Sequence, residues 1–150
     1  MAKKQTTWSV FPYSDKSYEY SAASLKKHWP RLHRGDREPF PDVHWLKTLI
    51  KTHPEIEPAG SMDKAATALQ GAWRAYHRGD FAEAIDGGTA LGPIGTNVAN
   101  KAANIYATYL ETDADRKLAL LLASSQRAEA LQKSAGTLAS CRSSSPSRAR

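Results

Sequence analysis

The sequence predicts an all-α protein, and three observations point to that class. Apolar residues recur at helical spacing along most of the 150-residue chain, no segment alternates with period two, and Gly, Pro, Ser or Asp residues flank the periodic segments. Hydrophobic residues make up 41% and charged residues 24%, which is typical of a globular domain and argues against a fibrous or wholly disordered chain. A chain of this length can bury a core without a metal or a disulfide. We therefore expect one packed helical unit with tails.

Residues 1–60 are predicted to form a strap and a helical extension that pack on the rest of the chain. The aromatic segment 8–13 is stopped by proline, which favours an extended strap over a strand in a sheet. A helix is expected over 17–34. Pro30 lies inside that helix, lacks an N–H and clashes with the preceding turn, so we expect a kink or a break near Trp29.

Side chains that can cap a helix stand before several of the later apolar segments. Asp42, Ser61 and Asp80 are each followed by residues with helical periodicity, and Thr112 with Asp115 forms a similar pair. Each segment then ends near Gly or Pro or at a further cap. The predicted helices span 42–52, 61–78, 81–91, 97–111 and 114–132.

Two adjacent glycines interrupt the predicted helix over 81–91. Gly87 and Gly88 cost up to about 1 kcal/mol each relative to alanine inside a helix. Their presence predicts close approach of a neighbouring helix, which the absence of a side chain would permit.

Two internal repeats can be read from the sequence. The segments 29–36 and 73–80 share Trp-x-x-[Leu/Tyr]-His-Arg-Gly-Asp, and each fits a helix end, a glycine stop and a cap for the next segment. A second correspondence appears when helices 61–78 and 81–91 are shifted by 34 residues onto 97–111 and 114–132. The shift pairs Ala65 with Ala99, Ala68 with Ala102, Ala72 with Tyr106, Ala84 with Leu118 and Gly88 with Leu122.

This period and one local motif carry a resemblance to the tetratricopeptide (TPR) family. Gly79-Asp-Phe-Ala-Glu-Ala-Ile85 resembles the turn and second-helix start of a TPR unit, usually Gly-[Asp/Asn]-[Tyr/Phe]-x-x-Ala-[Ile/Leu]. Gly88 departs from the family, which usually has a large aromatic residue there, and the second unit lacks the Gly-Asp turn. The resemblance covers about residues 63–132, and the aromatic strap and proline-containing helix before them resemble those of bacterial proteins that carry TPR-like repeats.

The resemblance implies antiparallel helical hairpins stacked as a short TPR-like array, acting as a non-catalytic protein–protein interaction scaffold. Such arrays bind a partner segment in a groove formed largely by the first helix of each hairpin. An alternative for the aromatic members is packing against the N-terminal helices. The groove positions implied by the resemblance are Leu69, Trp73, Tyr76, His77, Asn100, Ala103 and Leu110.

The charge is uneven and suggests an alternative function. Of the formal net charge of +6, four units lie in the Ser/Arg-rich tail 133–150, which we expect to be disordered, either as a functional tail or as the mark of a truncated repeat array. A second cluster could make the protein a basic helical nucleic-acid-associated protein that also uses the tail, although the modest charge of 1–132 favours a solvated helix face. This basic patch consists of Lys26, Lys27, Arg31, Arg34 and Arg37.

The remaining expectations concern chemistry and location. The five histidines lack metal-ligand spacing and no nucleophile motif is present, so we expect no catalytic residues, no metal and no cofactor. No apolar run could span a bilayer, and the single cysteine, Cys141, fits a cytoplasmic protein. The helix 114–132 has no cap beyond it, so self-association through that helix is a further expectation.

Overall fold

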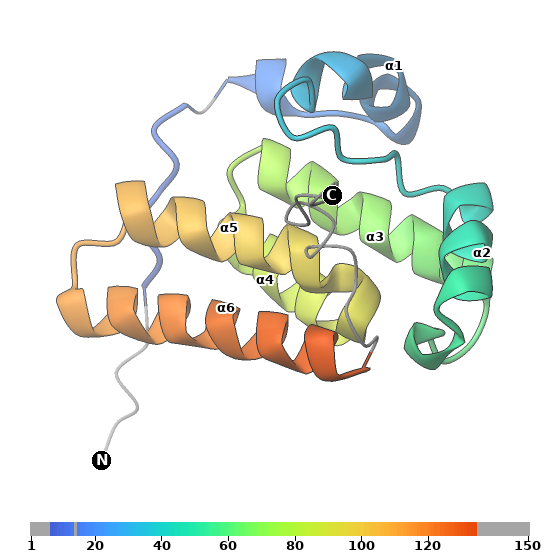
Figure 1. Ribbon diagram of the computed structural model, residues 1–150. Helices are drawn as coiled ribbons and strands as arrows, with labels where there is room; N and C mark the ends of the chain where they lie inside the picture. Colours follow the sequence, from blue (N-terminus) through green and yellow to red (C-terminus); the bar gives the residue numbers. More distant parts are fainter. Residues whose placement is uncertain (1–6, 14, 135–150) are drawn as a thin grey trace, which may run out of the picture.

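The computed structural model describes residues 7–13 and 15–134, and this part of the chain contains helices and no strands (Figure 1). The all-α prediction is therefore confirmed. The last helix runs to Ser134, so Lys133 and Ser134 do not belong to a tail as predicted. The rest of the predicted tail, 135–150, lies outside the described residues.

Six α-helices and three short 3-10 helices follow one another along the described part of the chain. The α-helices are α1 (Ala22–Leu32), α2 (Val43–Thr52), α3 (Met62–His77), α4 (Phe81–Ala90), α5 (Thr96–Tyr109) and α6 (Ala114–Ser134). The 3-10 helices are η1 (Lys16–Tyr18), η2 (Pro54–Ile56) and η3 (Gly92–Gly95).

The first α-helix begins later than predicted and is continuous through Pro30. It begins only at Ala22, because Ser21 and Ser24 form a reciprocal cap: Ser21 Oγ accepts from the Ser24 backbone N–H at 3.1 Å, and Ser24 Oγ accepts from that of Ser21 at 2.8 Å. Of the kink or break predicted near Trp29, the break does not occur, because the helix continues to Leu32. Pro30 lies in the exposed last turn, where its missing N–H removes one bond close to the helix end.

Capping explains where most of the later helices begin. The Asp42, Ser61 and Asp80 side chains accept hydrogen bonds from the third backbone N–H of α2, α3 and α4, at 2.8, 3.2 and 3.3 Å, which confirms these three predictions. For α6 the predicted pair of Thr112 and Asp115 is wrong. Asp113 accepts from the third N–H at 2.9 Å, because it directly precedes the first helical residue.

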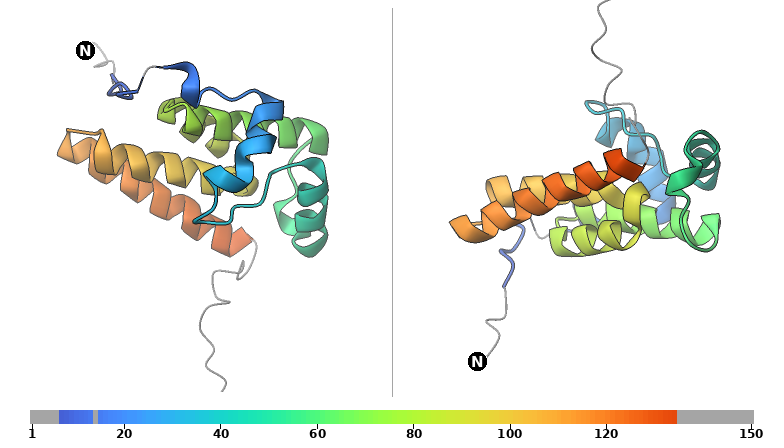
Figure 2. Two further views of the ribbon diagram at one scale, coloured as in Figure 1. Left: turned by 90° about the horizontal axis from the view of Figure 1, so that it is seen from above. Right: turned by 60° about the horizontal axis from the view of Figure 1, so that its bottom comes forward.

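The helices α3, α4, α5 and α6 pack in chain order, each antiparallel to the one before (Figure 1). α1 lies across α3 and α5, and α6 lies on the far side of α5 from α1 (Figures 1 and 2). α2 packs against the N-terminal half of α3. The stack thus has one end covered by the N-terminal segments and one end formed by α6.

The core joins the N-terminal segments to the stack. One cluster of buried side chains brings together Leu25 and Trp29 of α1, Leu69 and Trp73 of α3, and Val98 of α5. Each of these residues is less than 5% exposed. The N-terminal extension is therefore packed on the helix stack and does not form a core of its own.

The predicted close approach at the glycine pair occurs at Gly88. A Cβ atom placed there would lie 2.7 Å from the carbonyl oxygen of Gly95 and 2.9 Å from a methyl group of Val98. Gly87 is different, because a Cβ atom there would meet Ala72 at an ordinary 3.5 Å. Gly88 is therefore the position at which α4 and the start of α5 require a residue without a side chain.

Candidate functional site

The two copies of the Trp-x-x-[Leu/Tyr]-His-Arg-Gly-Asp motif meet in space. Each copy ends a helix, α1 in the first case and α3 in the second, and the two helix ends lie together. The Trp29 and Trp73 rings pack edge to face with centroids 5.5 Å apart. The Nε2 atoms of His33 and His77, 44 residues apart in sequence, are 3.0 Å from each other. The repeat is thus a pair of contacting elements.

The hydrogen bonds of this histidine pair determine which ring nitrogens carry protons. Both oxygens of the Asp36 carboxylate lie 3.1 Å from Nδ1 of His33, and an ionised carboxylate can only accept. Nδ1 of neutral His33 therefore donates, and its Nε2 accepts from the Nε2–H of His77. Lys101 pairs with the same carboxylate. The donor sequence runs from His77 to His33 to Asp36.

Burial keeps both imidazoles neutral. Desolvation on burial lowers the pKa of His33 to about 4, and the nearby positive charge of Lys101 lowers it further. Loss of solvent likewise lowers the pKa of His77 to about 4, with a smaller contribution from His33. The pair is a neutral hydrogen-bonded contact at pH 7, and both Nε2 atoms are occupied by it.

An aromatic hollow adjoins the histidine pair. This hollow, of about 530 Å³, lies between the N-terminal segments and the helix stack, and both His77 and Arg31 line it. The size falls in the range of small-molecule sites. Five phenylalanine or tyrosine rings line it, three from the N-terminal segment and two from the helix stack: Phe11, Tyr18, Tyr20, Tyr76 and Phe81. Leu32 and Ile105 complete the lining.

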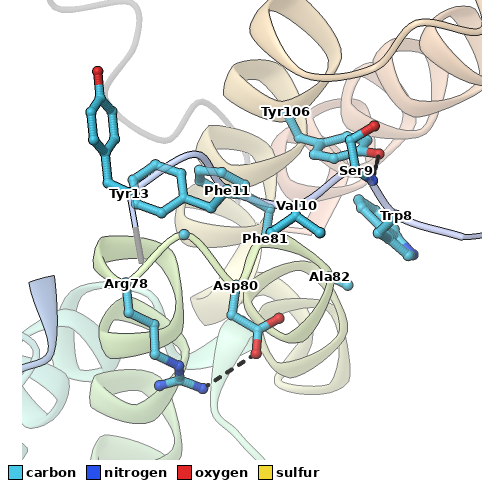
Figure 3. A pocket seen from close by; sticks show the side chains of 11 residues that line it. Trp8, Ser9, Val10, Phe11, Tyr13, Arg78, Asp80, Phe81, Ala82 and Tyr106 are labelled. Atoms are coloured by element: carbon cyan, nitrogen blue, oxygen red, sulfur yellow. Dashed lines mark hydrogen bonds and ion pairs between the residues drawn. The ribbon is translucent and has the colours of Figure 1, made fainter. Parts of the chain in front are cut away.

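The strap formed by residues 8–13 creates a second hollow of about 420 Å³ (Figure 3). The strap is anchored by Trp8, whose ring lies 4.4 Å from that of Tyr106, and by the Ser9 backbone N–H, which donates to the Tyr106 hydroxyl at 2.8 Å. Phe11 contacts Gly79, where a side chain would collide with its ring and where φ is +82°. This strap has the extended, packed form that we predicted.

The groove positions implied by the resemblance do not form one open surface. Leu69 and Trp73 are only 2% and 1% exposed and lie in the core beneath α1, so their assignment to a partner groove is wrong. Asn100 faces α6 instead, where its amide donates to the Ser124 carbonyl at 2.9 Å and its oxygen accepts from Arg127 at 2.8 Å. The N-terminal helix occupies the side of α3 that the resemblance left open.

The other groove positions have separate surroundings. Tyr76 and His77 are half-buried and line the aromatic hollow. Ala103 is fully buried, and Leu110 is half-buried against the same cluster as Trp8 and Phe11. Of the seven positions, Tyr76 and His77 are the two that line the aromatic hollow.

The basic patch is exposed as expected from its composition. All five cations lie on α1 or in the turn after it, and each is exposed: Lys26, Lys27, Arg31, Arg34 and Arg37. Arg37 adopts a positive φ of 53° in this turn. Lys26 lies 5.9 Å above the ring of Phe40.

The last helix presents an uncovered apolar face. Leu118, Leu121 and Leu122 are 67%, 40% and 56% exposed, and Tyr109 at the end of α5 is 78% exposed. Large apolar side chains at spacings of three and four residues share one face of a helix. Ser124, on the side toward α5, is the buried residue of α6.

The described part of the chain offers no cluster of three or more residues that could ligate a metal ion. Among the helices within residues 7–13 and 15–134, none has the length and apolar character that crossing a bilayer requires. Sequence reasoning did not pair His33 with His77, since ligand-spacing rules compare near neighbours. The repeated His-Arg-Gly-Asp segment was the available signal.

Comparisons with known proteins found no matching family model, no similar curated protein and no similar solved structure.

Proposed function

We propose that this protein is a non-catalytic interaction scaffold of TPR-like type that binds an amphipathic helix of a partner protein against α6. The observation that supports the proposal most directly is the exposure of three leucines on the last helix of the stack. Helical repeats bury their faces on neighbours, and an end that binds nothing normally carries a polar cap.

The 34-residue correspondence identifies what could cover this face. Ala84 and Gly88 of α4 are buried, and Gly88 contacts the start of α5. Their counterparts under the shift, Leu118 and Leu122 of α6, are exposed. A helix lying on α6 as α5 lies on α4 would cover these two leucines.

The leucines also indicate the chemistry of the partner. A helix with apolar residues at i, i+3, i+4 and i+7 would pack against them in the helix-in-groove manner. Glu129, seven residues beyond Leu122, forms an ion pair with Lys133 at 3.0 Å, so the charges at this end of the face are balanced. The partner is therefore specified by its apolar face, with no preference for one sign of charge.

A selection for helical peptides tests the proposal. Full-length protein would be used to select binders from a displayed library of amphipathic helical peptides. We expect the selected peptides to lose at least tenfold in affinity for the Leu118→Glu/Leu122→Glu variant. The matched control is Val10→Glu, an exposed apolar residue on the strap, which should bind the peptides like the wild type.

Three results would contradict the proposal. The first is selection of peptides that bind the α6 variant and the wild type equally. The second is a transition to dimers in sedimentation velocity that the α6 variant abolishes, which would assign the face to a second copy of this chain. A catalytic turnover that depends on the aromatic hollow is the third.

A further inference from the structure

The basic patch on α1 lies beside the aromatic hollow, and the two share one residue. Lys27 and Arg31 are four residues apart on α1, so they lie on one face about 6 Å apart along the axis. Arg34, which is also exposed, follows three residues after Arg31 in the turn beyond the end of α1. Arg31 belongs to the row and also lines the hollow of about 530 Å³.

The charges of this row are uncompensated. Within residues 7–13 and 15–134, none of the five cations of the basic patch takes part in an ion pair. Asp36 is the one acid between residues 26 and 37, and it is held by Lys101 and by His33. The positive potential of the row is therefore directed at solvent.

The hollow supplies planar apolar surfaces next to that charge. Tyr18 and Tyr20 come from the N-terminal segment and Tyr76 from the end of α3, and all three are half-buried. Tyr13, which is 59% exposed, has its ring 5.7 Å from that of Tyr18. Aromatic rings beside a row of cations are the combination that binds single strands, since rings stack on bases while cations contact phosphates.

A lipid surface fits these residues less well. Interfacial helices insert large apolar side chains beneath their basic face. Of the large apolar residues of α1, Leu25 and Trp29 are buried in the core and Leu32 is half-buried in the lining of the hollow. The exposed apolar residues that remain are Ala22, Ala23 and Pro30. α1 thus has the charge of such a helix without the inserting face.

We propose that the cation row of α1 and the adjoining aromatic hollow form a binding site for single-stranded nucleic acid. Lys27, Arg31 and Arg34 contact successive phosphates. A base enters the hollow and stacks on a tyrosine ring. This site lies apart from α6, so it does not depend on the helix-binding function proposed above.

Fluorescence anisotropy with full-length protein and labelled 12-mers of deoxythymidine and of uridine tests the site. The Lys27→Gln/Arg31→Gln/Arg34→Gln variant should bind at least tenfold more weakly at low salt. It should also reduce the slope of log affinity against log salt by about 2, because three phosphate contacts are lost. The matched control, Arg142→Gln/Arg148→Gln/Arg150→Gln, removes the same charge from the C-terminal segment. The control should change affinity less than threefold.

The hollow is tested separately from the charge. Tyr18→Leu should weaken binding about fivefold or more, as expected for one stacked base, and leave the salt slope unchanged. Photo-crosslinking of the wild type with a 5-bromouracil oligonucleotide should modify the peptides that contain Tyr18, Tyr20 or Tyr76. The crosslinking result does not depend on the folding of a variant.

Four results would contradict a single-stranded nucleic-acid site at α1 and the hollow. An equal loss in both charge variants would show nonspecific attraction. Poly-glutamate that binds as tightly as the oligonucleotides would identify a site for acidic peptides, and preferential binding to phosphatidylserine vesicles would identify a lipid site. Crosslinks confined to the segments outside α1 and the hollow would also contradict it.

Discussion

At the scale of single residues, two neighbouring glycines in the same helix have different roles. Gly88 is buried against the turn that precedes α5, and the nearest atom to a substituted Cβ would be a backbone oxygen, which cannot rotate away. Gly87 has ordinary space beside Ala72. Helix propensity favours alanine over glycine at both positions. Steric crowding opposes alanine at Gly88 but not at Gly87.

Replacing each glycine with alanine should separate these effects. We expect Gly88→Ala to lower the free energy of unfolding by about 1–3 kcal/mol, as overpacking does in well-packed contacts. Gly87→Ala is the matched control and should be neutral or stabilising by up to about 1 kcal/mol. Urea unfolding followed by circular dichroism measures both. Equal effects of the two changes would disprove the close contact between α4 and Gly95.

The buried histidine pair predicts a specific pH dependence of stability. The pKa of each histidine is about 4 in the folded protein, below the ordinary value of 6.5, so the unfolded chain binds protons first as pH falls. The contribution of the two neutral histidines to the free energy of unfolding is fully present above pH 6.5 and is lost as the pH falls from 6.5 through 4. The slope between these values is at most about 1.4 kcal/mol per pH unit for each histidine.

The His33→Gln/His77→Gln variant should show a smaller loss of unfolding free energy between pH 7 and pH 4.5 than the wild type. Glutamine retains an amide donor and acceptor but does not titrate in this range. The exposed residue His44 supplies the control, because His44→Gln should keep the wild-type pH dependence. Denaturant titrations at several pH values measure the free energy of unfolding of each protein. If it changed with pH by the same amount in all three proteins, titration of the histidine pair would be ruled out.

At the scale of helices, α4 and α6 correspond under the predicted 34-residue shift but have different surroundings. α5 covers α4, whereas one side of α6 faces solvent. The same substitution at corresponding positions should therefore have different costs. Ala84 is fully buried, and Leu118 is 67% exposed.

We expect Ala84→Asp to destabilise the protein by about 2 kcal/mol or more, since a charge would enter a tight apolar contact. Leu118→Asp should change stability by no more than about 0.5 kcal/mol. Thermal unfolding of the wild type and both variants under identical conditions measures the two changes in stability. A large loss from Leu118→Asp would mean that its face is already covered, for example by another copy of the chain.

At the scale of the whole molecule, the N-terminal segments and the helix stack share their core. Trp29 of α1 contacts Trp73 of α3, and the strap is anchored on Tyr106 of α5. Neither part can separate without exposing these rings to water. Burial of this kind makes the loss of one part costly for the other.

The described residues should therefore unfold in a single cooperative transition. Tryptophan fluorescence, which reports mainly on the N-terminal contacts, and far-UV circular dichroism, which reports on all helices, should give coincident curves. Trp8→Ala, which removes an anchor of the strap, should shift both curves together by about 1–3 kcal/mol. Two separated transitions would show that the N-terminal segments form an independent unit.

Several features could be predicted from the sequence because they depend on nearby residues. The helices α2 to α6 begin close to their predicted positions, and Asp42, Ser61 and Asp80 cap them as expected. The error at α1 arose because apolar residues before Ser21 match the helical period, while the reciprocal serine cap starts the helix later. The close helix approach predicted for the pair of glycines is confirmed at Gly88 but not at Gly87.

The sequence by itself determined the helical class, most helix boundaries and which residues share a face. The tertiary structure alone decided which faces are covered. Leu69 and Trp73 look like Leu118 and Leu122 by periodicity, yet α1 buries the first pair and leaves the second pair open. The tertiary structure also decided that His33 contacts His77, which is 44 residues away in the sequence. The reason is physical, because periodicity depends on one helix, whereas burial depends on the helix packed against it.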